Sequence, residues 1–362
     1  MTRETAPRGG GIRGVAQLAG VSISTVSRVL NEKNGNARVS EATVARVRSA
    51  AQQLRYRPNP WARSLRTAQT RTIGVITFDL VHPFAAELLR VIAAACHAHD
   101  YHLLVSTAEY DQHETWALCD ILSADRVDGV LLLGNVLSAQ AGRDDMERLL
   151  QAHGQVVTIG DRPSIAGELS VLVDDEYGVR LALEHLLALG HRRIAHVGIG
   201  YHADSWEDHH RLRAYRGFLQ AHNLQNDPAL EVALQGSDLE AASQALRSLL
   251  DLAHPPTALF VNNDATAIIM LKAAALSGIR VPEALSIVGF DDIGYAAMCI
   301  PGLTTVHQPI DQMGSYAARA LLEAIDGVRV ATVEPAAHRT VIFAPTLVVR
   351  ESSAPPAPTL RG

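Results

Sequence analysis

The chain has few cysteines and no long apolar runs. Its 362 residues include three cysteines, Cys96, Cys119 and Cys299, which are odd in number and far apart. Their spacing argues against a disulfide framework and favours a reducing compartment. The longest apolar runs, such as 129–134, are strand-sized, whereas a membrane-spanning helix needs about 20 residues. Residues 1–11 hold no apolar segment of the signal-peptide kind, so we expect a cytoplasmic protein without a membrane partner.

Charge is unevenly distributed along the chain. Residues 1–70 contain twelve Lys and Arg and three Glu, a net charge of +9; the whole chain carries −6, so residues 71–362 carry −15. A basic segment at one end of an acidic chain is typical of a nucleic-acid contact confined to that end. A merely solvated helical surface would give the same charge, so charge alone leaves both interpretations open.

The first part of the chain has the pattern of three short helices. The sequence predicts a helix over 15–19 that ends at Gly20, a second over 23–30 capped by Ser22, and a third that begins after Ser40. The second helix has apolar side chains on its inner face: Val26, Val29 and Leu30. Its other face carries short polar side chains, which suits the second helix of a helix-turn-helix in the major groove of DNA. A generic three-helix bundle is the alternative.

From residue 71 onward, strand and helix patterns alternate. Strands are predicted at 72–78, 102–106, 128–134, 155–159, 193–198, 257–262 and 285–290. Helices are predicted at 83–99, 112–124, 144–153, 176–189, 206–222, 239–251 and 264–277. This alternation predicts doubly wound parallel α/β sheets, and the units are too many for one sheet, so we expect two lobes. Ligands in such sheets bind at the carboxyl ends of the strands.

A long motif occupies the predicted head: Val15-Ala-Gln-Leu-Ala-Gly-Val-Ser-Ile-Ser-Thr-Val-Ser-Arg-Val-Leu-Asn31. It closely resembles the signature of the LacI/GalR family of transcriptional regulators. Further matches follow in order: Tyr56-Arg-Pro-Asn59, Ala62-Arg-Ser-Leu65, His185-Leu-Leu-Ala-Leu-Gly-His191, Asn263-Asp264, Val288-Gly-Phe-Asp-Asp292, Leu303-Thr-Thr305 and Pro345-Thr-Leu-Val-Val-Arg350. The resemblance covers about 12–350, nearly the whole chain.

The resemblance implies a small all-α helix-turn-helix head joined to an α/β, two-lobed effector domain like a periplasmic binding protein. We expect the DNA-binding domain at 12–57, a hinge helix and linker at 58–70, and an effector-binding and dimerisation domain at 71–350. One lobe is expected to hold about 71–172 with 303–330, and the other about 173–302 with 331–350. Residues 1–11 and 351–362 are expected to be disordered tails.

The resemblance also implies which residues contact DNA. Those on the second helix are Ser22, Ile23, Ser24, Thr25, Ser27, Arg28 and Asn31; those in the hinge are Asn59, Ala62 and Leu65. Ile23, Ser24 and Arg28 would reach base edges, and the other helix residues would mainly hold phosphates. Leu65 would act as a minor-groove wedge, although packing of Leu65 on the body is the alternative.

An effector site is expected where the strands of the body end. Phe84 and Arg211 match an aromatic and an arginine that bind ligand in the family, and Asp161, Asn263 and Asp291 lie at predicted strand ends. Carboxylates, an amide, a guanidinium and an aromatic ring together suit a sugar or sugar-like polyol. Each residue taken alone is equally an ordinary strand-end capping group. A purine or nucleoside effector is the alternative.

Motifs of the common enzyme classes are missing from the sequence. It contains no Gly-x-x-x-x-Gly-Lys loop, no Gly-x-Ser-x-Gly elbow and no zinc-type histidine spacing, so we expect no catalysis, cofactor or metal. The expected protein is a homodimeric repressor of a pseudo-palindromic operator, controlled allosterically by its effector. The sequence leaves open whether the effector releases or tightens DNA binding, and whether the dimers pair into tetramers. A free-standing sugar-binding protein is disfavoured by the basic head.

Overall fold

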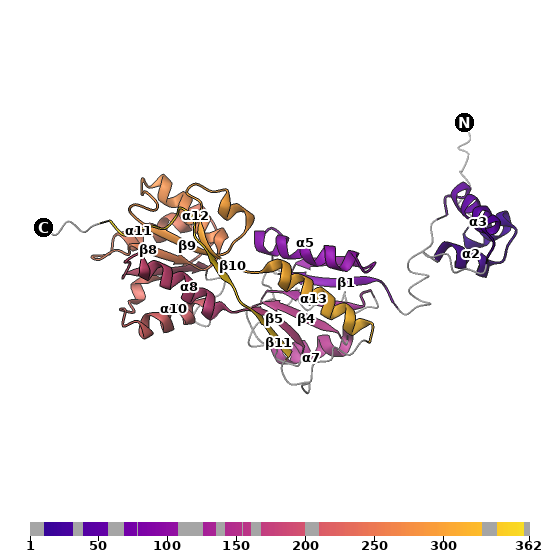
Figure 1. Cartoon of the computed structure of the whole chain (residues 1–362), viewed down its shortest axis with the longest axis horizontal. Coiled ribbons are helices and arrows are strands. Elements are labelled where there is room, and N and C mark those ends of the chain that lie inside the picture. Colours follow the sequence, from indigo (N-terminus) through magenta and orange to yellow (C-terminus); the bar gives the residue numbers. More distant parts are fainter. Residues whose placement is uncertain are drawn as a thin grey trace. The chain divides into compact units, whose positions relative to one another are not determined.

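The computed structural model describes residues 11–31, 39–56, 69–77, 79–107, 126–134, 142–153, 155–160, 168–199, 210–327 and 339–357. The chain separates into two compact units, Met1–Arg71 and Thr72–Gly362 (Figure 1). Within the described residues, no helix is long and apolar enough to cross a membrane.

The first unit is a three-helix head. Its helices are α1 (Ile12–Ala19), α2 (Ile23–Asn31) and α3 (Glu41–Gln53). They pack around Val15, Val26 and Val47, whose side chains are fully buried. Gly20 ends α1 in the left-handed conformation, with φ of 65°, which glycine adopts without a Cβ clash. Because α2 contacts both α1 and α3 through one apolar face, its opposite face stays exposed.

The first lobe of the body is a parallel six-stranded sheet. Its strands, in spatial order, are β11 (Arg339–Phe343), β5 (Leu169–Val173), β4 (Val156–Gly160), β3 (Gly129–Leu133), β1 (Thr72–Thr77) and β2 (His102–Thr107). The described helices of this lobe are α5 (Pro83–His97), α7 (Gly142–His153) and α13 (Ile310–Ile325). Helices α5 and α13 pack together, side by side along the sheet (Figure 1).

The second lobe is also a six-stranded sheet. Its strands, in spatial order, are β12 (Thr346–Val348), β10 (Thr304–His307), β9 (Ser286–Asp291), β8 (Ala258–Val261), β6 (Ile194–Ile199) and β7 (Glu231–Leu234). Its helices are α8 (Asp175–Ala188), α10 (His210–Ala221), α11 (Leu239–Leu250) and α12 (Asp264–Leu276), with short 3-10 turns η1 (Pro228–Leu230) and η2 (Gly294–Ala297). All pairs are parallel except β10 with the edge strand β12.

Strand β8 illustrates why these strands are apolar throughout. Ala258 and Phe260 belong to the core cluster that includes residues of α8 and α10, whereas Leu259 and Val261 belong to the cluster of α11 and α12. Successive side chains of a strand point to opposite faces, so a sheet covered on both faces needs continuous apolar runs. The strands were predicted from these apolar runs. The predictions for β1, β2, β3, β4, β6, β8 and β9 are confirmed within two residues at each end.

The lobe boundaries expected from the sequence are wrong in two places. Strand β10, expected in the first lobe, pairs with β9 in the second; strand β11, expected in the second, pairs with β5 in the first. Short strands find their sheet through hydrogen bonds to distant partners, which a local pattern does not encode. The chain therefore crosses between the lobes three times, after β5, after β10 and after β11. The predicted helix 112–124 lies outside the described residues.

The expected disorder of 351–362 is also wrong for its first part. Ser352 is fully buried, its hydroxyl donates to the carbonyl oxygen of Ile287 at 2.6 Å, and it accepts from the backbone N–H of Thr304 at 2.8 Å. The carbonyl oxygen of Ala354 lies 2.9 Å from Nε2 of His191. Residues 351–357 thus pack against the second lobe, because their backbone and hydroxyl groups bond to strand ends. Residues 358–362 lie outside the described part.

Candidate functional site

Helix α2 exposes the residues that we expect to read bases. Ile23 is 43% exposed, and Ser24 and Arg28, one turn apart, are exposed on the side opposite the buried Val26 and Val29. Thr25 and Ser27 are half-buried. A face of short polar side chains with one guanidinium fits a major groove, where Arg donates two parallel hydrogen bonds to the edge of a guanine.

Ser22 caps this helix, as its position predicts. Its Oγ accepts from the backbone N–H of Thr25 at 3.2 Å and lies 2.8 Å from the hydroxyls of Ser24 and Thr25. Ser40 caps α3 in the same way, accepting from the N–H of Thr43 at 3.4 Å. These caps fix where each helix begins and hence which residues α2 presents. The side chain of Asn31 lies outside the described part, as do all atoms of Asn59, Ala62 and Leu65.

In the second unit, Arg211 on α10 is surrounded by acceptors from three other elements. Its Nε donates to Oδ1 of Asp175 at 2.8 Å, and one terminal nitrogen, Nη1, donates to the backbone oxygen of Asn262 at 2.6 Å. The same Nη1 lies 3.6 Å from Oδ1 of Asp291. The guanidinium carbon lies 3.6 Å from the ring centre of Phe290, which gives a cation–π contact. Two strand ends, of β8 and β9, and the start of α8 thus meet at one cation.

Asp291 ends strand β9 in an unusual backbone conformation. Its φ is 120° and that of Asp292 is 57°, so two successive non-glycine residues lie in the left-handed region. Such a conformation costs free energy, and it persists where the surroundings hold it in place. Nε2 of Gln308 donates to Oδ1 of Asp291 at 2.7 Å, and its backbone N–H bonds to the Asp291 carbonyl oxygen at 3.3 Å. Gln308 thereby fixes this strand end.

Burial controls the protonation of Asp291. It raises the pKa of the carboxyl to about 7, while the charge of Arg211 and the hydrogen bond from Gln308 lower that pKa less than burial raises it. The pKa of Asp264, on α12, is also raised, mainly by burial and then by the charge of Asp291. The site thus holds two acidic groups that both resist ionisation near neutral pH.

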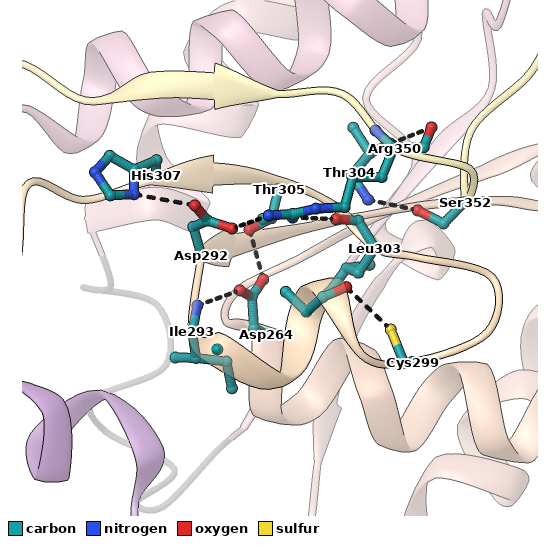
Figure 2. A network of polar contacts seen from close by, with 12 residues as sticks. Asp264, Asp292, Ile293, Cys299, Leu303, Thr304, Thr305, His307, Arg350 and Ser352 are labelled. Atoms are coloured by element: carbon teal, nitrogen blue, oxygen red, sulfur yellow. Dashed lines mark hydrogen bonds and ion pairs between the residues drawn. The ribbon is translucent and has the colours of Figure 1, made fainter.

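A polar network supports the turn after β9 (Figure 2). Asp292 accepts from the guanidinium of Arg350 at 2.6 Å and lies 3.0 Å from Nδ1 of His307. Asp264 accepts from the Thr305 hydroxyl at 2.5 Å and from the backbone N–H of Ile293 at 3.0 Å. Figure 2 shows these groups converging from α12, β10 and the chain after β12. The network thereby holds Asp292 and Ile293, the two residues that follow Asp291.

The other predicted effector residues have different positions. Phe84 is half-buried in the first turn of α5 and packs against the main core cluster. Its neighbour His82 lies within electrostatic reach of Arg211: burial lowers the His82 pKa, Asp79 raises it and Arg211 lowers it. Oε1 of Glu87 on α5 accepts from the backbone N–H of Gly294 at 2.9 Å, so the first part of α5 lies beside the turn after β9. Asn263 caps α12 by accepting from the N–H of Thr266 at 2.8 Å, so its side-chain oxygen has the capping role. Asp161 lies outside the described residues.

A cavity of about 690 Å³ adjoins this cluster. It is lined by the end of β5, the first turns of α8, the outer face of α10, and β11. Asp175 belongs to both the cavity wall and the Arg211 cluster, whereas Phe84, Asn263 and Asp291 do not line the cavity. Two lobes contribute to its wall, since β5 and β11 belong to the first and α8 and α10 to the second.

The sequence prediction missed Asp175, Asn262 and Gln308. Asp175 comes shortly after strand β5, which was not among the predicted strands. The short apolar run Leu169–Val173 is the signal that could have located this strand and the residues at its end. Asn262 acts through its backbone oxygen, which no side-chain motif reveals. Gln308 follows β10 at the crossing into α13, and its role depends on the pairing of β10 with β9.

Comparison with known proteins identifies the family. The pattern described as "Bacterial regulatory proteins, lacI family" matches residues 11–59, and the pattern "Periplasmic binding protein-like domain" matches 183–353. The ribose operon repressor of Escherichia coli (strain K12) is 34% identical over 87% of this chain and 92% of its own. A CelR–cellobiose complex is 32% identical, with a TM-score of 0.65, over 94% of this chain and 99% of its own. A lac repressor dimer bound to operator and the anti-inducer ONPF is 26% identical, with a TM-score of 0.77, over 94% and 98%. The chain belongs to the lacI family of bacterial DNA-binding transcriptional regulators.

Proposed function

We propose that this protein is a cytoplasmic repressor whose homodimer binds a pseudo-palindromic operator, and that a sugar or sugar-like polyol bound in the second unit controls that binding. The DNA-binding part is supported by the exposed polar face of α2. Among its structural relatives, the lac repressor dimer bound to operator supports a dimer that binds operator DNA. The CelR–cellobiose complex supports a sugar as the effector.

The observation that carries the effector part is the cluster around Arg211. Two carboxylates, a backbone oxygen and a guanidinium converge there beside the start of α5, which holds Phe84. Carboxylates accept hydrogen bonds from sugar hydroxyls and guanidinium groups donate to them, while an aromatic ring can pack on the sugar face. The ligand contacts proposed for Phe84, Asp161, Arg211, Asn263 and Asp291 follow this logic.

In the head, Ile23, Ser24 and Arg28 are proposed to read bases, and Ser22, Thr25, Ser27 and Asn31 to hold phosphates. The hinge residues Asn59, Ala62 and Leu65 are proposed to enter the minor groove, with Leu65 as the wedge. The function is regulatory rather than catalytic. By linkage, effector and operator alter each other's affinity by the same factor.

The DNA part is tested by Arg28→Ala in a titration against operator selected from the protein's own genome. Loss of a base-reading Arg should weaken specific binding by about 1–3 kcal/mol and relax sequence preference at one position per half-site. Arg180→Ala, in the exposed part of α8, is the matched control. Unchanged affinity and specificity in Arg28→Ala would contradict the assignment of α2.

The effector part is tested by thermal unfolding of the full chain with sugars, nucleosides and purines. A ligand at a hundred times its dissociation constant stabilises the folded state by about 2.7 kcal/mol. A sugar that also shifts the operator titration would support the proposal. A nucleoside or purine that does so in its place would keep the regulator and overturn its proposed effector class.

A further inference from the structure

The Arg211 guanidinium is already engaged by the protein on two of its edges. Asp175 accepts from Nε at 2.8 Å and the Asn262 backbone oxygen accepts from Nη1 at 2.6 Å, while Phe290 covers one face at 3.6 Å. The side chains of Arg211 and Asp175 are 11% and 7% exposed. Arginine recognises phosphate or carboxylate with two parallel N–H donors. An anionic ligand that used Nε or Nη1 would have to displace Asp175 or Asn262.

The charges around Arg211 also disfavour an anionic ligand. One guanidinium faces two carboxylates, Asp175 at 2.8 Å and Asp291 at 3.6 Å, so the three groups together carry no positive charge in excess. Charges interact far more strongly in a buried site than in water. A ligand anion would therefore meet the Asp175 carboxylate and find no surplus positive charge on Arg211.

The hydrogen-bonding capacity of the cluster also favours one ligand class. A carboxylate paired with a guanidinium can only accept hydrogen bonds, so a ligand group that contacts Asp175 must supply a donor. A sugar hydroxyl is both donor and acceptor, whereas a phosphate dianion offers acceptors alone. A phosphate group therefore suits this cluster poorly, because it brings negative charge and has no hydrogen-bond donor for the carboxylate.

We propose that the Asp175–Arg211 ion pair makes this site selective for uncharged, hydroxyl-rich ligands over their phosphate esters. Asp175 is the specificity-determining residue, because it neutralises the guanidinium that would otherwise attract an anion. This inference rests on the proposed effector function and narrows its ligand class.

The test compares the full-length protein with Asp175→Asn. Asparagine keeps the shape and the acceptor oxygen for Arg211 Nε but removes the negative charge. Glu240→Gln, which removes the same charge from an exposed residue of α11 outside the cavity wall, is the matched control. Each protein is titrated, by calorimetry and thermal unfolding, with inorganic phosphate and with three pairs: ribose and ribose 5-phosphate, glucose and glucose 6-phosphate, adenosine and adenosine 5′-phosphate.

The natural protein should bind an uncharged member at least about ten-fold more tightly than its phosphate ester, since one ion pair at this distance carries at least that much discrimination. Asp175→Asn should reduce that ratio about ten-fold and gain affinity for inorganic phosphate. Glu240→Gln should do neither, and adding Arg211→Gln to Asp175→Asn should abolish the gain.

Preference of the natural protein for a phosphate ester would overturn the inference and leave the effector function standing. An Asp175→Asn protein no more responsive to phosphate than Glu240→Gln would also overturn it. A phosphate gain in Asp175→Asn, with no uncharged member bound by the natural protein, would support the inference and count against the proposed effector class.

Discussion

Gln308 donates a 2.7 Å hydrogen bond to Asp291, and both side chains are buried. Asp291 ends a strand of the second lobe, whereas Gln308 stands where the chain leaves that lobe for α13 of the first. A group that we propose to contact ligand is thereby joined directly to a crossing between the lobes. A change at Asp291 would act on the lobe connection through one side chain.

Replacing Gln308 with alanine should therefore destabilise the body. The substitution leaves the buried Asp291 carboxyl without that donor, at a cost of about 1–3 kcal/mol in the free energy of unfolding. Urea unfolding monitored by circular dichroism measures the change. Gln235→Ala is the control, because Gln235 is exposed and its Nε2 donates a long hydrogen bond, 3.4 Å, to the carbonyl oxygen of Ala233. Equal stabilities of the two variants would contradict a structural role for the Gln308 bond.

Protonation of Asp291 should make stability fall as pH rises. Its pKa is raised from 3.8 to about 7 in the folded protein, so the folded state binds the proton more tightly than the unfolded chain does. The resulting stabilisation is complete below about pH 4 and is lost as pH rises through about 7. Asp264, whose pKa is also raised, contributes with the same sign.

Asp291→Asn should flatten that dependence. The measurement is the free energy of unfolding in urea at pH 5 and pH 8, compared as a difference for each protein. Glu283→Gln, at an exposed position, should behave as the natural protein does. A pH difference that survives undiminished in Asp291→Asn would show that another group titrates.

Gly289→Ala should disturb the network of Figure 2. A Cβ at Gly289 would lie 2.2 Å from Oδ1 of Asp264 and 3.0 Å from a Leu303 methyl. Asp264 is held by Thr305 and Ile293, so relief of the clash breaks a bond, and we expect a loss of about 1–3 kcal/mol in thermal unfolding. Gly217→Ala on α10, where a Cβ meets nothing within 4 Å, should instead be neutral or stabilising. A larger loss of stability in Gly217→Ala than in Gly289→Ala would contradict the packing argument.

Removal of residues 352–362 should destabilise the second lobe. The truncation removes Ser352, which bonds Ile287 and Thr304, and Ala354, which bonds Ser286 and His191. Buried groups left without partners cost about 1–3 kcal/mol each, so the melting temperature should fall by several degrees. A chain that ends at residue 357 keeps these bonds and should melt as the full chain does. Equal melting of the two truncations would show that the segment contributes nothing.

Local patterns predicted the parts of the fold that local physics determines. The caps at Ser22 and Ser40, the stop at Gly20 and the apolar runs of β1, β3 and β9 depend on neighbouring residues, and the structure has each of them. The family motif likewise singled out Arg211 and Asp291, which meet at 3.6 Å.

What the sequence could not predict depends on partners far along the chain. Asp175 pairs with Arg211 across 36 positions, and that pairing exists only because α8 and α10 lie side by side. Strand β11 joins the first sheet because β5 offers it an edge. Ser352 is buried because strand ends of the second lobe receive its hydrogen bonds, although a segment rich in Ser, Ala and Pro looks like a solvated tail. Each of these contacts is a property of the assembled sheets.

The three crossings between the lobes have a consequence for synthesis on the ribosome. Neither lobe is a continuous stretch of chain, and the edge strands β11 and β12 are among the last to emerge. Until residue 348 has left the exit tunnel, β5 and β10 each present an open row of backbone donors and acceptors, the kind of edge that invites pairing with other chains. The nascent protein must therefore be protected until residue 348 has emerged, and both lobes become complete within a few codons of each other.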